Sequence, residues 1–150
     1  MMFTTPPYHK QKLNIPADWE IKRNEFYDID PFDNSPADDK EVLIFVQEDI
    51  LWLKKGNYNI DLGWYGGQDL KNEGAGFCIY VYRGDHWHNC DLLEKFRSKN
   101  KQNVVDKLDS LIKSVDKGEY DNLIGHRIDE DDLTNQNSME DFEAYSVKDD

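Results

Sequence analysis

The sequence predicts an α+β domain, with an antiparallel β-sheet of about five strands and one or two C-terminal helices packed on one face of it. Two observations lead to this fold class. Segments with strand patterns occupy the first half of the chain, and the clearest helical pattern comes after them. With 150 residues and an apolar content of 38%, the chain is long enough to bury a single core.

Five segments have strand patterns, at about residues 19–27, 41–46, 50–53, 58–64 and 77–82. The most regular is 58–64, in which apolar residues alternate with Asn59, Asp61 and Gly63, the period of a strand with one buried face. In 77–82 both alternating sets are apolar, which predicts a central strand with something packed on each side. We therefore expect successive antiparallel strands.

Two segments in the second half predict helices. Apolar residues from Val104 to Val115 fall at helical spacing, and Gly118 stands where the end of a helix favours glycine. A shorter helix is expected to begin at Asp91, with Glu94 three residues later as a capping box. That helix would bury Leu92, Leu93 and Phe96.

The loops and the two ends complete the expected organisation. Residues 28–39 are dense in turn formers and carboxylates, and residues 66–76 are rich in glycine, so we expect both to be loops. The first dozen residues predict an arm or an edge segment. Apolar residues become sparse after Arg127, which predicts one α+β domain at 1–127 and an acidic, mostly disordered tail at 128–150.

The charge of the chain is segregated. There are 31 acidic residues against 18 basic ones, a formal net charge of −13. Residues 18–49 carry a net charge of −8, residues 129–150 also carry −8, and residues 50–117 carry +2. This distribution disfavours binding to nucleic-acid phosphates or anionic lipid and favours a basic protein partner, although acidic flanks also serve solubility.

Several features bear on the compartment. No window has the apolar length of a membrane span, and Pro6, Pro7 and Tyr8 stand where a signal peptide would need an apolar core. Two cysteines, Cys78 and Cys90, are too few for a disulfide framework. We therefore expect a cytoplasmic protein with ordinary buried thiols.

Four local patterns contain residues that could bind a ligand, a metal or RNA. The loop that begins at Asp28 does not fit the EF-hand template, because Phe32 and Asp33 occupy its fifth and sixth positions. The glycines of 63–76 lack the Gly-Lys-Ser/Thr element of a phosphate-binding loop. A single basic patch could neutralise a neighbouring acidic segment or contact RNA, and it comprises Lys95, Arg97, Lys99 and Lys101. The fourth pattern is the cluster of His86, His88 and Cys90, whose side chains could bind a metal.

One run of residues carries a resemblance to a known family. From Val46 to Gly66 the sequence is VQEDILWLKKGNYNIDLGWYG, followed by a glycine-rich hairpin, an aromatic strand and Trp87. This pattern resembles the immunity proteins of bacterial polymorphic toxin systems, including contact-dependent growth inhibition, over about residues 41–115. The resemblance implies a cytoplasmic, non-catalytic protein that binds one cognate toxin domain, commonly a nuclease, and blocks its active site or its access to substrate.

The charge and the resemblance lead to one leading hypothesis, a stoichiometric toxin inhibitor with no cofactor, no bound metal, no contact with nucleic acid and no membrane. An acidic loop would meet a basic toxin cleft, and aromatic side chains would supply desolvated anchors. The expected toxin-binding residues are Asp28, Asp30, Phe32, Asp33, Asp38, Asp39, Glu41, Trp64, Tyr65 and Asp69.

Two other functions stay open. A small metal-dependent hydrolase would use His86, His88 and Cys90, with Asp85 beside them, although their spacing matches no recurrent metal pattern and lacks a fourth ligand. A non-catalytic adaptor would instead dock onto a basic protein through the acidic tail at 129–150.

Overall fold

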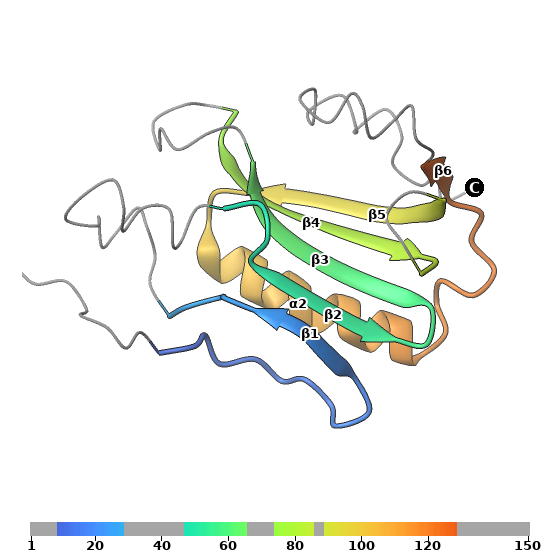
Figure 1. Ribbon diagram of the computed structural model, residues 1–150, viewed down its shortest axis with the longest axis horizontal. Coiled ribbons are helices and arrows are strands. Elements are labelled where there is room, and N and C mark those ends of the chain that lie inside the picture. Colours follow the sequence, from blue (N-terminus) through green and yellow to red (C-terminus); the bar gives the residue numbers. More distant parts are fainter. Residues whose placement is uncertain (1–8, 29–46, 66–73, 86–88, 129–150) are drawn as a thin grey trace, which may run out of the picture.

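A six-stranded antiparallel sheet and one long helix make up the described part of the protein. The computed structural model describes residues 9–28, 47–65, 74–85 and 89–128. Each strand pairs with the next one in the sequence, so the sheet is a simple meander. The helix α2 crosses one face of the sheet and lies between β5 and β6 in the sequence (Figure 1). The strands are β1 (Glu20–Asn24), β2 (Leu51–Lys55), β3 (Tyr58–Tyr65), β4 (Gly76–Arg83), β5 (Cys90–Ser98) and β6 (His126–Ile128), and the helix is α2 (Lys101–Asp116).

The alternation of β3 sets the two faces of the sheet. Ile60, Leu62 and Trp64 belong to the core beneath α2, while the residues between them face the other way. In the tight β2–β3 hairpin, Lys55 pairs with Tyr58 and Gly56 adopts a φ of 61°, a left-handed conformation that glycine accepts at little cost. The side chains of β4 divide between the two faces in the same way.

The helix α2 closes the main core. Its buried face consists of Val104, Leu108, Leu111, Ile112 and Val115, all 7% exposed or less. The side chain of Asn100 caps the helix N-terminus by accepting a 2.9 Å hydrogen bond from the backbone N–H of Asn103. Gly118, with a φ of 74°, follows the last turn. The apolar periodicity alone thus placed this helix correctly.

The predicted fold class is confirmed as α+β with an antiparallel sheet and a helix packed after the strands, but the sheet has six strands instead of about five. Four predicted strands correspond to β1 through β4. The strand expected at 41–46 lies outside the described residues. Near the N-terminus, Lys10 forms an isolated bridge with Tyr27, so this part of the expected arm is an edge segment.

The prediction of a short helix at Asp91 was wrong, because these residues form β5. Asp91 pairs with Arg83, and Phe96 pairs with Ile79. At a register irregularity Val81 pairs with Glu94 and Tyr82 pairs with Leu92, so Leu93 is the extra residue. Leu93 and its neighbour Glu94 then share the face of the main core, which hides the period of two in the sequence. Pairing along an apolar central strand therefore outweighed the local capping signal.

Two of the segments outside the described residues join the sheet at the same end. Segment 29–46 runs between Asp28 and Gln47, and segment 66–73 joins Tyr65 to Gly74. The rings of Phe26 and Phe77 pack edge to face at 6.4 Å, which links the first junction to the β3–β4 end. Residues 129–150 instead follow β6, which pairs with the opposite end of β5 (Figure 1).

No helix in the described parts of the chain is both long enough and apolar enough to cross a membrane.

Candidate functional site

The face of the sheet opposite α2 carries a row of polar and aromatic side chains, and it is called here the helix-free face because none of the described residues forms a helix on it. The antiparallel register aligns one residue from each of five neighbouring strands across it. Cross-strand partners lie on the same face, so Asp61 of β3 stands at the centre of the row. The row reads Arg23, Trp52, Asp61, Tyr80 and Lys95.

The chain crosses this face directly above Gly63. A Cβ atom at Gly63 would lie 2.2 Å from the carbonyl oxygen of Glu48, so only glycine permits the approach. The N–H of Ile50 donates to the carbonyl of Leu62 at 3.0 Å, and the N–H of Trp64 donates to that of Gln47 at 2.8 Å. Glu48 and Asp49 therefore form a bulge opposite Gly63.

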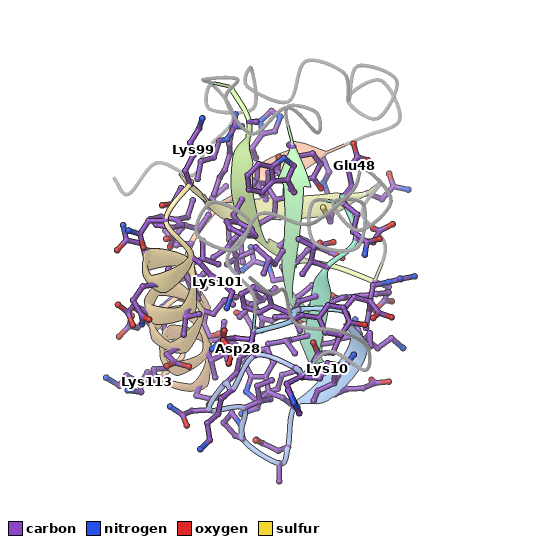
Figure 2. All side chains as sticks on the ribbon, turned by 90° about the vertical axis from the view of Figure 1, so that its left-hand side faces the viewer. Lys10, Asp28, Glu48, Lys99, Lys101 and Lys113 are labelled. Carbon is purple, nitrogen blue, oxygen red and sulfur yellow. The ribbon has the colours of Figure 1, made fainter. Side chains whose placement is uncertain are left out.

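The bulge brings carboxylates towards the central row. Figure 2 shows Glu48 on the side of the sheet away from α2. Glu48 and Asp49 are both exposed. The negative charge of Asp49 acts on Asp61, and that of Glu48 acts on Tyr65. The helix-free face therefore has acidic residues near its centre, whereas the two ends of the central row are basic, with Arg23 on β1 and Lys95 on β5.

Asp61 is the most strongly perturbed carboxyl group described. It keeps a minor exposed fraction, but its carboxyl is almost surrounded by protein atoms, and this burial raises its pKa to about 7. The charge of Asp49 raises the pKa further, whereas Arg23 lowers it. None of the described residues donates a hydrogen bond to this carboxylate or forms an ion pair with it. Its charged form is therefore poorly compensated.

Aromatic rings flank Asp61. The ring of Tyr65 packs edge to face against that of Tyr80, with centroids 5.9 Å apart. Burial raises the pKa of Tyr65, Tyr80 and Tyr82, so all three phenols are neutral at physiological pH. On the other side, the indole of Trp52 donates a 2.9 Å hydrogen bond to Asn59 Oδ1. A carboxyl edged by aromatic rings is suited to a cationic group.

The two thiols on this face are inert. Cys78 and Cys90 are at most 1% exposed, and burial raises their pKa values to about 11 and about 12, respectively. Both thiols therefore stay protonated at neutral pH, the opposite of what a nucleophile or a metal ligand needs. The burial of Cys90 disfavours the hydrolase alternative.

A metal site finds no support in the part of the chain that the structure describes. There, no group of three or more His, Cys, Asp or Glu side chains is placed to hold a metal ion. His86 and His88, the other members of the predicted cluster, lie outside the described residues, and Asp85 forms a 3.6 Å ion pair with Lys54.

Three of the predicted toxin-binding residues are described, and they differ in accessibility. The side chain of Asp28 is 70% exposed and forms a 3.7 Å ion pair with Lys101. Tyr65 is partly buried on the helix-free face. Trp64 is a correction to the predicted set: it is 2% exposed and packs edge to face on Phe77 at 5.0 Å, so it belongs to the core. The others lie outside the described residues, namely Asp30, Phe32, Asp33, Asp38, Asp39, Glu41 and Asp69.

The basic patch has two roles. Lys101 is buried, donates to Gln11 and pairs with Asp28, so it neutralises the start of an acidic segment (Figure 2). Arg97 donates a 2.6 Å hydrogen bond to the carbonyl of Gly74 and so ties β5 to the β3–β4 loop. Lys95 stands in the central row of the helix-free face. Lys95 and Arg97 lie on β5, and not on the helix or linker that the sequence suggested, whereas Lys99 follows β5 and Lys101 begins α2.

Sequence reasoning missed Asp49, Asp61 and Trp52 as site residues. Asp61 was assigned to the polar, solvated side of its strand. A signal was present: the strand at 77–82 was expected to be covered on both faces, so a carboxylate on the next strand would share the covered side. The bulge over Gly63 left no such signal.

Comparisons of the chain with protein-family models, with curated proteins and with solved structures found no match.

Proposed function

We propose that this chain is a cytoplasmic immunity protein that binds a cognate toxin domain, most suitably a basic nuclease, and blocks its active site or its access to substrate. It acts without catalysis. The acidic segments outside the described residues supply long-range attraction, and the helix-free face supplies contact area.

The observation that carries this proposal is the separation of charge. The described residues contain fifteen acidic and fifteen basic side chains, so the entire net charge of −13 belongs to the segments outside them. A neutral scaffold joined to strongly acidic segments suits capture of a basic surface, because clustered charge speeds encounter. Segments 29–46, with a net charge of −4, and 66–73, with a net charge of −1, join the sheet at the end where Glu48 and Tyr65 lie, and 129–150 carries the other −8.

The direct test is co-expression with the protein encoded immediately upstream. We expect cells that make both proteins to survive and the two proteins to purify as a one-to-one complex. Unprotected cells and the absence of a complex would contradict the proposal.

The role of the acidic loop is tested by association kinetics with a matched control. We expect reversal of Asp38 and Asp39 to lysine to slow association at least tenfold at low salt, on the order seen for electrostatic steering. The same charge change at Asp106 and Glu119, exposed residues on the α2 side, should have a much smaller effect. Equal rates for both double variants would remove the loop from the mechanism.

Deletion of residues 129–150 separates the inhibitor from the adaptor. The tail carries a net charge of −8 but follows β6, at the end of β5 opposite the junctions of the other two segments. An inhibitor that works through its folded domain keeps its partner after the deletion, whereas an adaptor that docks by its tail loses it.

A further inference from the structure

Among the described residues of the helix-free face, Asp61 is a carboxyl group at the centre of the sheet that has no hydrogen-bond or ion-pair partner. Asp61 lies in β3, between Trp52 on β2 and Tyr80 on β4. No described residue gives it a hydrogen bond or an ion pair, and its side chain is only partly exposed to solvent. An uncompensated buried carboxylate destabilises a protein unless a cation or a donor completes it.

Two cations on this face are already engaged with other groups. Lys22 Nζ lies over the ring of Trp52, 5.5 Å from its centroid, and Arg97 donates to the carbonyl of Gly74. Arg23 shares the central row and lowers the pKa of Asp61, but its guanidinium lies beyond ion-pair distance. Neither these cations nor any other described side chain, Lys95 included, forms an ion pair with Asp61, so a group of a partner can complete its carboxylate.

The surroundings of Asp61 favour a guanidinium group. The edges of Trp52 and Tyr65 are partly exposed, and a planar guanidinium can stack on such rings while it donates two hydrogen bonds to a carboxylate. Exposed Glu48 and Asp49 stand at the rim and add attraction for positive charge. A hydrated ammonium group would gain less from the same rings.

We propose that Asp61, with Trp52 and Tyr65 beside it, receives one arginine side chain of the basic protein partner. This inference rests on the proposed function, and it names the anchor by which the helix-free face holds that partner. The bound guanidinium supplies the counter-charge that Asp61 lacks in the free protein.

The probe for this site is a hexa-arginine peptide, with its affinity measured by calorimetry at pH 6 and pH 8. The peptide binds the ionised carboxylate, and Asp61 in the free protein has a pKa of about 7. We therefore expect affinity for the wild-type protein to rise about tenfold over this range. Saturating peptide should also move the pKa of Asp61, followed by carbon-13 NMR of its carboxyl, towards that of an ordinary aspartate.

The charged and titratable groups that face Asp61 come from five parts of the chain, and the variants compared must leave them unchanged. They are Arg23 on β1, Glu48 and Asp49 before β2, Tyr65 on β3, Cys78, Tyr80 and Tyr82 on β4, and Lys95 on β5. Asp61→Asn leaves all of these groups in place and keeps the side-chain shape. Glu119→Gln removes one negative charge from an exposed position on the α2 side and serves as the matched control.

We expect Asp61→Asn to bind the peptide about tenfold more weakly at pH 8 and to lose most of the rise with pH, while Glu119→Gln behaves as the wild type. Thermal melts establish that both variants are folded. Equal affinity and equal pH dependence for all three proteins, or an unchanged carboxyl titration in saturating peptide, would overturn the arginine site. The proposed function is tested separately, by co-expression, and it fails if the wild-type protein does not protect the cells.

Discussion

The two faces of the sheet are built on opposite principles. Beneath α2, apolar side chains of β2, β3, β4 and β5 meet one amphipathic helix, and most of them are 2% exposed or less. On the helix-free face, tyrosines, thiols, Asn59 and Asp61 occupy the equivalent positions. The first arrangement gives stability. The second places Asp61, a carboxyl group without a partner among the described residues, at the centre of the sheet, so this face is the more suitable one for recognition.

The largest expected effect tests the stabilising face. Leu108 is fully buried under the sheet, so Leu108→Ala removes apolar contacts and leaves a cavity. We expect a loss of about 2–5 kcal/mol in the free energy of unfolding, measured by urea denaturation. Ser110→Ala, at an exposed position of the same helix, should change stability by less than about 0.5 kcal/mol. Similar losses in the two variants would mean that α2 does not close the core in this way.

At the centre of the helix-free face, a substitution is expected to raise the free energy of unfolding instead of lowering it. Asp61 has a pKa of about 7 in the folded protein against 3.8 for an ordinary aspartate, so the folded state holds its proton more tightly than the unfolded chain. Its contribution therefore lowers stability as the pH rises from about 4 to 7, and the penalty is complete above that range.

We therefore expect Asp61→Asn to be more stable than the wild type at pH 8, by about 2–4 kcal/mol. The gain shrinks as the pH falls and vanishes near pH 4. Urea denaturation across this range measures it, with Glu119→Gln as the variant that should show no such trend. A loss of stability for Asp61→Asn at pH 8 would mean that the carboxylate has a structural partner.

A smaller effect is expected at the bulge. Gly63→Ala places a methyl group against the carbonyl of Glu48, so the crossing chain must shift, at an expected cost of about 1–3 kcal/mol. Gly56→Ala meets no atom within 4 Å and has only the strain of its left-handed backbone, about 1 kcal/mol. Thermal melts of the two variants separate steric displacement from backbone strain. If Gly63→Ala melts at or above the temperature of Gly56→Ala, the close crossing is wrong.

Much of the stabilising face could be predicted from the sequence, because its signals are local and periodic. The apolar spacing from Val104 to Val115 fixed α2, and the alternation from Tyr58 to Trp64 fixed β3 and its buried side. The predictions that failed concern residues whose secondary structure is determined by strand pairing. Asp91 and Glu94 have a local helix-start signal that was outweighed when β5 paired with β4.

The helix-free face was harder to predict, since its character depends on residues that meet only after folding. Asp61 looks like an ordinary solvated position in its strand, and nothing local shows that Glu48 and Asp49 bulge above Gly63. Trp64 is different, because the alternation of its strand already predicts that it shares the buried side with Ile60 and Leu62, and its choice as a toxin contact disregarded that signal. The charge segregation, by contrast, was visible in the sequence and still carries the functional proposal.

The most direct test of the difference between the two faces is the titration of Asp61 in the free protein, followed by carbon-13 NMR of its side-chain carboxyl. The structure predicts a pKa of about 7 for this group, because it is largely buried beside Asp49 and has no partner. A pKa near 3.8 would mean that the carboxylate is solvated or paired, and it would contradict a recognition site centred on Asp61.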